Sequence, residues 1–308
     1  MNSIESLRLD FDKQISELGK IKNDKISDNL IFVGSGDSYV AGLIAEYITD
    51  HKCECQSPSD LLNSRFRDDK TYCFISVTGK TRANIEVARR ANKAGIKTVA
   101  VTLNKNSKLA KVCQQIVPLK ITKINTVNAG FSTFVGNIVT CLQIAGIDVP
   151  LKFDTWHEKG IELSLNLLNT VTLPQEKERL CLLGNNILYA IVLYISFQMA
   201  EFFGTTATPH KLEEFCHSPI FGLKKSDYVW ILGQNEKRYS SRLERLNLRV
   251  SYMELYNSDV ISQVFQSIFL IQNLMLLLAK RHGYTERKFL LKEDVLKASS
   301  NIIYNDLS

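Results

Sequence analysis

The sequence predicts an α/β protein of two units, each a three-layer αβα sandwich around a parallel sheet. Short apolar runs of strand length alternate with longer segments of helical pattern along most of the chain. This order is typical of parallel sheets that helices cover on both faces. The chain has 308 residues, of which 45% are hydrophobic, and this suits two domains of ordinary size with sizeable cores.

The first unit is expected over residues 28–153, after an N-terminal helix within residues 1–27. Its strands should be the short apolar runs that end in polar or glycine-containing turns, at 30–33, 53–56, 71–77, 96–103 and 114–119. Helices are expected where amphipathic segments follow these runs, from residue 37 or 38 onward and at about 82–94, 107–113 and 132–147.

A linking helix over residues 154–172 and a second unit over residues 173–308 complete the predicted organisation. The second unit repeats the alternation more weakly. Its strands are expected at 179–184, 227–233 and 248–255, and its long helices at 185–203 and 261–283. The two units therefore share a related design.

The net charge is +6, with Lys and Arg scattered rather than grouped. Such a surface attracts small anions, and we expect neither a nucleic-acid nor a membrane partner. The most apolar runs, 187–197 and 264–280, are too short or too interrupted by polar side chains for a membrane span, so they should be core helices. The N-terminus has no signal-peptide pattern and the seven cysteines include no CxxC pair, so we expect a reducing cytoplasmic location.

The turn after the first strand carries two glycines and invites comparison with a dinucleotide-binding loop. Gly34 and Gly36 stand in the order of GxGxxG, but Tyr39 takes the place of the third glycine, which in such sites allows close packing of helix on strand. The next strand also ends in Gln56 rather than in the acidic residue that holds the ribose hydroxyls. We therefore expect no dinucleotide, and no other cofactor.

A turn rich in hydroxyls follows the third expected strand. Ser76, Thr78 and Thr81 surround Gly79 just before a helix begins. Ligands of parallel sheets bind beyond the carboxyl ends of the strands, where the N–H groups and dipole of a helix N-terminus favour an anion. Ser38 occupies the equivalent turn of the neighbouring strand, so two hydroxyl-lined turns together suit a phosphate monoester. The alternative is that these hydroxyls only cap helices.

The two turns resemble the phosphate loops of the sugar isomerase (SIS) domain family. Their segments are GSGDSYVAG (34–42) and ISVTGKTRAN (75–84), and the second family loop usually reads Ser-x-Ser-Gly-(Glu/Asn)-Thr. The matching positions, which the resemblance assigns to the phosphate, are Ser38, Ser76, Thr78, Gly79 and Thr81. Lys80 departs from the usual acidic or amide residue.

The resemblance also implies residues around the sugar. The segment VNAGFSTFVGN (127–137) is similar to the later family segment whose small and hydroxyl residues line the sugar. The residues assigned to the sugar are Gly36, Ser132, Thr133 and Glu214.

Isomerisation of a sugar phosphate needs a general base of tuned pKa beside C1 and C2, and a group that opens the ring. Glu201 ends a strongly apolar helix, an environment that raises the pKa of a carboxyl toward neutrality. His217 follows in a Cys-His-Ser-Pro turn.

This segment resembles the isomerase half of glucosamine-6-phosphate synthase and the archaeal bifunctional phosphoglucose/phosphomannose isomerases. Residues 214–219 match Glu-x-x-His-Gly-Pro with Ser218 in place of glycine, and Glu201 precedes His217 by 16 residues, as in that family. The resemblance makes Glu201 the enolisation base and His217 the ring-opening acid/base. The family lysine three residues before the glutamate is Gln198 here.

Both groups of enzymes use a further lysine near the C-terminus. The resemblance assigns this role to Lys297, with Lys292 as a competing candidate. A metal site of His210, Glu214 and His217 is an alternative, but their spacing crosses a proline-flanked loop and the family needs no metal, so none is expected.

The expected function is a sugar-phosphate isomerase that interconverts aldose and ketose forms of a hexose 6-phosphate or amino-hexose 6-phosphate through an enediol(ate). Two alternatives stay open: an amino-sugar phosphate deaminase or aminotransferase-like enzyme, and a non-catalytic sensor of sugar phosphates. The resemblance also implies a homodimer whose site is shared, because the family takes its histidine from a partner subunit.

Overall fold

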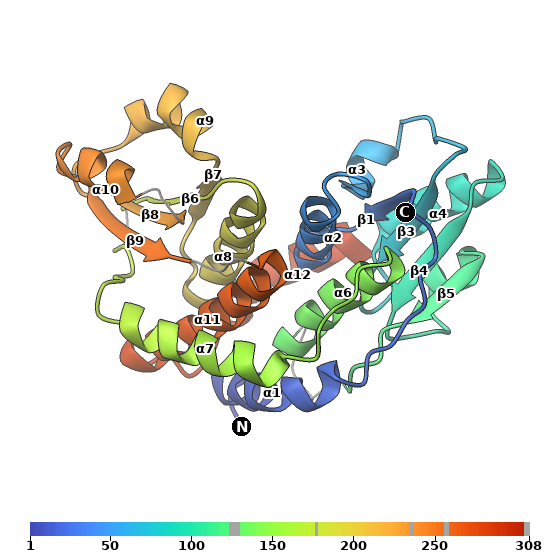
Figure 1. The fold of residues 1–308 in the computed structure, drawn as a ribbon, viewed down its shortest axis with the longest axis horizontal. Coiled ribbons are helices and arrows are strands. Elements are labelled where there is room, and N and C mark those ends of the chain that lie inside the picture. Colours follow the sequence, from blue (N-terminus) through green and yellow to red (C-terminus); the bar gives the residue numbers. More distant parts are fainter. Residues whose placement is uncertain (123–129, 176–177, 234–236, 256–258, 305–308) are drawn as a thin grey trace. The chain divides into compact units, whose positions relative to one another are not determined.

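The computed structural model describes residues 1–122, 130–175, 178–233, 237–255 and 259–304. The chain divides into two compact units (Figure 1). Unit 1 holds Met1, Ser6–Leu151 and Lys292–Ser308, and unit 2 holds Asn2–Glu5 and Lys152–Leu291.

The sheet of unit 1 has five parallel strands in the order β2-β1-β3-β4-β5. The strands are β1 (Leu30–Val33), β2 (Glu54–Gln56), β3 (Thr71–Ile75), β4 (Thr98–Thr102) and β5 (Gln115–Pro118). Every residue of β1, β3 and β4 is buried. Because both faces of these strands are covered, their sequences are continuous apolar runs rather than alternating ones.

Helices cover both faces of this sheet (Figure 1). On one face, alternate residues of β1 and β3, such as Ile31 and Phe74, share an apolar core with three helices. On the other face, the α2 residue Gly42 packs closely on Phe32 of β1, and α2 also packs on α6. The helices of the first face are α3 (Pro58–Leu61), α4 (Arg82–Lys93) and α5 (Lys108–Val112); those of the second are α2 (Asp37–Ile48) and α6 (Phe131–Ile144). Helix α1 (Ser3–Leu18) packs on α6, where the rings of Phe11 and Phe131 are in contact.

The sheet of unit 2 has four parallel strands in the order β7-β6-β8-β9. The strands are β6 (Leu180–Leu183), β7 (Ala207–His210), β8 (Tyr228–Gly233) and β9 (Arg249–Glu254). On one face, Cys181 and Leu183 share a core with α9 (Leu212–His217) and α10 (Lys237–Glu244). The other face packs on α8 (Ile187–Phe203), which in turn contacts α11 (Val260–Arg281).

The long helix α11 is a core element of unit 2. Among the described residues it alone is long and apolar enough to cross a membrane, yet most of its apolar stretch is buried inside the protein. It packs along α7 (Phe153–Leu167), where Trp156 stacks on Phe265 with ring centroids 4.8 Å apart. A Cβ on Gly160 of α7 would lie 2.7 Å from Phe269, so the two helices are in close contact. This packing is that of a buried helix, as the sequence predicted.

The predicted fold class is confirmed, since two parallel sheets lie between helices in the described chain. The short elements α3, β7, α9 and α10, and also α12 (Glu293–Tyr304), were not predicted. The structure groups α12 with unit 1, where it contacts α4, whereas residues 292–308 were predicted to belong to the second unit. Two short 3₁₀ helices, η1 (Pro219–Gly222) and η2 (Lys288–Leu291), complete unit 2.

Candidate functional site

The turns after β1 and β3 lie where the strand order of unit 1 reverses. β2 lies on one side of β1, whereas β3, β4 and β5 follow on the other. Open α/β sheets bind ligands beyond the carboxyl ends of their strands at such a reversal. The predicted phosphate residues fall in the β1 turn (residues 34–38) and the β3 turn (residues 76–81), and β1 and β3 are hydrogen-bonded neighbours. The topology thus brings both turns to one edge of the sheet.

Glycines shape the β1 turn. A Cβ on Gly34 would lie 2.8 Å from the backbone carbon of Ser38, so a larger residue would push α2 away. Gly36 has φ 58° and ψ −133°, values of the first central residue of a type II′ turn, which glycine adopts without strain. The N-cap residue of α2 is Gly36, which has no side chain to cap the helix. The first-turn N–H groups therefore lie beside the half-buried Ser38 at this edge of the sheet.

Two hydroxyls face each other across the β3 turn. Oγ of Ser76 lies 3.1 Å from Oγ1 of Thr81, and Ser76 is 4% exposed. The N–H of Gly79 donates to the Ser76 carbonyl at 3.0 Å and closes the turn, with φ 64° at the glycine. Thr78 and Lys80 are exposed at its tip. Neutral donors and one cation therefore surround a compact turn.

The β3 hydroxyls do not act as helix caps. Thr81 is the N-cap residue of α4, but its side chain makes no cap bond. Ser57 and Ser107 differ, because each accepts a backbone N–H at the start of α3 or α5. Ser57 and Ser107 thus cap helices, whereas Thr81 does not. The uncapped N–H groups of α4 and the Ser76–Thr81 pair leave several donors for an anion.

Lys297 lies on α12 in unit 1, the unit that carries both turns. α12 contacts α4, which begins at the β3 turn. Lys292 comes just before α12, and its carbonyl accepts the N–H of Leu296 at 2.9 Å. Both lysine side chains are exposed, so neither is committed to the core.

Ser132 and Thr133 are buried at the start of α6, and their hydroxyls already have partners. Oδ1 of Asp10 accepts the Ser132 hydroxyl at 2.6 Å, and Oδ2 accepts the Ser132 N–H at 3.1 Å. The Thr133 hydroxyl donates to the Gly130 carbonyl at 2.8 Å. Asp10 was not predicted as a site residue, although a carboxylate among the apolar positions of α1 was a signal. Residues 127–129 of the predicted sugar segment lie outside the described residues.

The turn after β6 repeats the geometry of the β1 turn in unit 2. Asn186 has φ 49° and ψ −129°, close to the values of the second glycine in the β1 turn. A Cβ on Gly184 would lie 2.6 Å from a backbone oxygen of α8. Oδ1 of Asn185 accepts the N–H of Leu212 at 3.1 Å. Unit 2 thus uses this turn to hold α9, the helix that ends in the predicted acid/base histidine.

Glu201 lies near the end of α8 and pairs with a buried arginine. Nη1 of Arg287 lies 3.2 Å from Oε2 of Glu201; the arginine side chain is 2% exposed and the glutamate side chain 39%. Burial raises the pKa of the Glu201 carboxyl, and Arg287 opposes that rise. Arg287 was not predicted as a site residue, because it lies 86 residues from Glu201 in a segment without a motif.

His217 is the last residue of α9 and is open to solvent. Its side chain is 77% exposed, and Nε2 lies 3.8 Å from Oε1 of Glu213. Glu214 is exposed as well. In the described structure His217 contacts Glu213 and not Glu201. His210, Glu214 and His217 do not gather into a group that could hold a metal ion, within the described residues.

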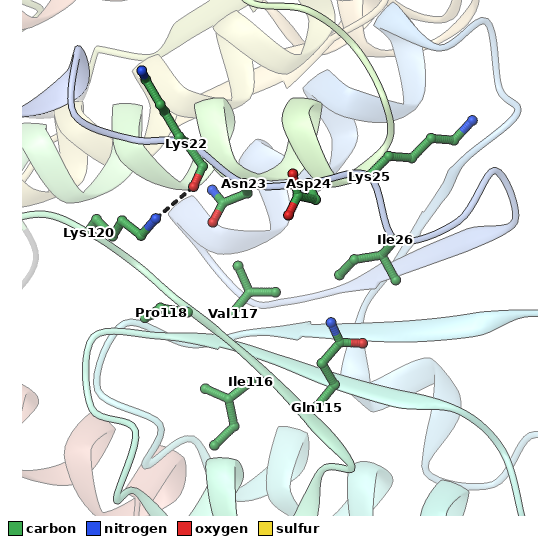
Figure 2. Close-up of a pocket in the computed structure, with 10 residues that line it drawn as sticks. All are labelled: Lys22, Asn23, Asp24, Lys25, Ile26, Gln115, Ile116, Val117, Pro118 and Lys120. Atoms are coloured by element: carbon green, nitrogen blue, oxygen red, sulfur yellow. Dashed lines mark hydrogen bonds between the residues drawn. The ribbon is translucent and has the colours of Figure 1, made fainter.

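A polar pocket of unit 1 lies beside the edge strand β5 and not at the two turns. Residues 22–26, β5 and Lys120 line it (Figure 2). The side chains of Lys22 and Lys25 extend away from β5 (Figure 2), and Nζ of Lys120 donates to the Lys22 carbonyl at 2.7 Å. These cations do not converge as the groups of an anion site would, so the pocket does not compete with the turns.

No protein-family model matches the sequence, and no curated protein matches it at the sequence level. Solved structures match the fold over most of the chain. Glucosamine-6-phosphate deaminase from Thermotoga maritima is 16% identical with a TM-score of 0.74, and the match covers 92% of this chain and 96% of that one. The C-terminal domain of glucosamine-fructose-6-phosphate aminotransferase from Francisella tularensis is 16% identical with a TM-score of 0.68, over 90% and 96% of the two chains.

Tagatose-6-phosphate ketose/aldose isomerase from Escherichia coli is also 16% identical, with a TM-score of 0.65 over 92% of this chain and 89% of that one. These matches span both units of the chain. Together with the two parallel sheets, they show that the chain has the SIS-type fold of phosphosugar isomerases and of the isomerase domain of glucosamine-fructose-6-phosphate aminotransferase.

Proposed function

We propose that the chain is a sugar-phosphate isomerase that acts on a hexose 6-phosphate or an amino-hexose 6-phosphate. The observation that carries the proposal is the pair of turns at the strand reversal of unit 1, where two helices begin at N-cap residues that make no side-chain cap bond and two hydroxyls face each other. Neighbours named for glucosamine 6-phosphate and tagatose 6-phosphate support the class of ligand.

The phosphate is proposed to bind at the two turns. Ser38, Ser76, Thr78 and Thr81 donate hydroxyl hydrogen bonds to its oxygens, while Gly79 lets the backbone approach. Ser76 and Thr81, which bond to each other in the structure, then turn toward the anion. Binding energy at the phosphate orients the distant reacting carbons.

The proposed chemistry is a proton transfer between C2 and C1. His217 opens the sugar ring, and Glu201 then takes the proton from C2 and returns it to C1 through an enediol(ate). The raised pKa of the Glu201 carboxyl suits a base that must exchange protons near neutral pH. Lys297 stabilises the negative charge that develops on the oxygen.

The remaining proposed residues surround the sugar. Because Gly36 has no side chain, the sugar can approach the backbone of the β1 turn there. The exposed Glu214 contacts the sugar from the α9 segment. Ser132 and Thr133 keep their hydroxyls in structural bonds, so they act through the position of the α6 backbone. No metal or cofactor takes part in the proposed reaction.

The test of this function is a panel of hexose and hexosamine 6-phosphates followed by NMR in D₂O. Deuterium that enters at C1 or C2 identifies an isomerase. Released ammonia with deuterium exchange would replace the isomerase with an amino-sugar deaminase, and a thermal shift without exchange would replace it with a sensor. Absence of both binding and exchange across the panel would contradict the proposal.

We also propose that the protein acts in the cytoplasm as a homodimer in which Glu201 and His217 of one site come from different subunits. The 77% exposure of His217 leaves it available to a second copy. The expected result is that a mixture of inactive Glu201→Gln and His217→Asn subunits regains activity. Random exchange should restore about one quarter of the wild-type rate, because half of the dimers are mixed and each contains one intact site.

The complementation is measured after unfolding and refolding the two variants together. The control is a mixture refolded from Glu201→Gln subunits alone, which should stay inactive. A mixture as inactive as this control, with dimers confirmed by light scattering, would show that the two residues act within one subunit.

A further inference from the structure

Arg287 is a buried cation beside the proposed base. Its side chain is 2% exposed, and Nη1 lies 3.2 Å from Oε2 of Glu201. The guanidinium also lies over the ring of Phe289, 4.8 Å from the ring centroid. A buried arginine carries a high desolvation cost, which the paired carboxylate and the ring offset. Its position is therefore tied to that of Glu201.

The first residues of the chain hold the Arg287 segment in place. Oγ of Ser3 accepts the N–H of Arg287 at 2.9 Å, and Oε2 of Glu286 accepts the N–H of Ser3 at 3.1 Å. The N–H of Ile4 donates to the Thr285 carbonyl at 3.3 Å. All these residues belong to unit 2. These bonds at Thr285, Glu286 and Arg287 thus tie the start of the Arg287 segment to the first residues of the chain.

The other charged groups around Arg287 have different contacts. Glu286 binds the Ser3 backbone, and Nζ of Lys288 lies 5.0 Å from the centroid of the Tyr284 ring. Position 198, one turn before Glu201 on α8, carries a neutral glutamine that is 3% exposed. Of the residues described, Arg287 is thus the one whose charge pairs with the Glu201 carboxylate.

We propose that Arg287 is a positioning residue for Glu201, which holds Oε2 and leaves Oε1 to accept and release the substrate proton. The inference rests on the proposed function, because it takes Glu201 as the base. It also accounts for the absence of a lysine at position 198: the cation beside the carboxylate comes from a distant segment instead of from the same helix.

The test compares Arg287→Gln and Arg287→Lys with the matched control Arg249→Gln. Arg249 lies at the same distance from a carboxylate, 3.2 Å from Oε1 of Glu178, but its side chain is 52% exposed. The first readout is the titration of ¹³C-labelled glutamate carboxyls by NMR, with Glu201 assigned from the Glu201→Gln spectrum. Loss of the cation in Arg287→Gln should raise the pKa of Glu201 further. Arg287→Lys keeps a cation, so its Glu201 pKa should lie close to the wild-type value, and the control should leave the pKa of Glu201 unchanged.

The second readout is turnover of the sugar phosphate as a function of pH. In Arg287→Gln, kcat should fall about 100-fold through loss of geometry, with KM little changed and the acidic limb of the profile shifted to higher pH. An unchanged Glu201 titration and kcat in a folded variant would overturn the inference. If Arg287→Gln does not fold, the kcat of Arg287→Lys decides. Lysine keeps the charge but not the planar guanidinium that holds Oε2, so kcat should still fall while the Glu201 titration stays near that of the wild type. A wild-type kcat in this variant would overturn the inference.

The two readouts separate this inference from the proposed function. A shifted Glu201 titration in Arg287→Gln, in a protein that turns over no sugar phosphate, would support the pairing and contradict the isomerase. Turnover in the wild type with an unaffected Arg287→Gln variant would contradict the positioning role alone.

Discussion

Replacing Glu201 with glutamine is expected to lower the rate of sugar-phosphate isomerisation about 1,000-fold, because an amide cannot take the proton from C2. Glutamine keeps the shape of the side chain and can still accept a hydrogen bond from Arg287. The phosphate turns belong to unit 1 and Glu201 to unit 2. Binding of a sugar phosphate should therefore remain close to that of the wild type while turnover is lost.

The measurements are deuterium exchange at C1 and C2 for turnover and calorimetry for binding. The matched control is Glu162→Gln, which removes an exposed carboxylate of unit 2 that pairs with Lys159 and should leave both readouts unchanged. Thermal melting checks the fold, because the variant leaves the buried Arg287 without its anionic partner. Equal losses of binding and turnover in a folded variant would show that Glu201 is structural and not the base.

The same residue predicts the pH dependence of turnover. Burial raises the pKa of the Glu201 carboxyl, and a base must be deprotonated to act. The rate should therefore rise with pH, and the midpoint of this rise should lie above the ordinary pKa of a glutamate, which is about 4.3. A midpoint at the ordinary value would mean that Arg287 outweighs burial.

The sequence was sufficient for the parts of the fold that local patterns determine. A continuous apolar run identified each strand buried on both faces, and the predicted limits of β1 agree with the structure at Leu30–Val33. The predicted helix start at residue 82 agrees with the start of α4. These elements carry their signal in consecutive residues, so periodicity and turn residues were enough.

The missed elements have their cause in tertiary contacts. β7 has the sequence Ala-Thr-Pro-His, and its proline is tolerated because β7 is an edge strand of its sheet. No residue of α12 is buried, so this helix has no core stripe that would mark its unit from the sequence. Its assignment to unit 1 follows from a contact with α4 that is remote in sequence.

In the candidate site, too, the features set by consecutive residues were predicted and those set by contacts remote in sequence were not. Hydroxyls and glycines of the β1 and β3 turns are local motifs and were found by their spacing. Asp10 and Arg287 are single charged residues whose partners lie far along the chain, 122 and 86 residues away. A buried ion pair or cap of this kind leaves no periodic trace in one sequence, so only the structure could identify it.

Replacing Gly79 with alanine is expected to destabilise unit 1 by about 2–4 kcal/mol, since left-handed strain and overpacking add at one position. The glycine has φ 64°, and an added Cβ would lie 2.1 Å from Oγ and 2.4 Å from Cβ of Ser107. Ser107 cannot easily yield, because its hydroxyl caps α5 by accepting the N–H of Ala110 at 3.2 Å. The β3 turn must move instead, and with it the hydroxyls of Ser76 and Thr81.

Because that movement misplaces hydrogen bonds to a charged ligand, affinity for a sugar phosphate should fall about 10- to 100-fold. The matched control is Gly95→Ala at the other end of α4, where φ is 76° and a Cβ would meet nothing within 4 Å. Gly95→Ala introduces backbone strain without overpacking, so it should lower the free energy of unfolding by about 1 kcal/mol. Its affinity for the sugar phosphate should be unchanged. Urea denaturation and calorimetry separate the two effects. Equal affinity in both variants would show that the anion does not bind at the β3 turn, since Gly79→Ala distorts that turn and Gly95→Ala does not.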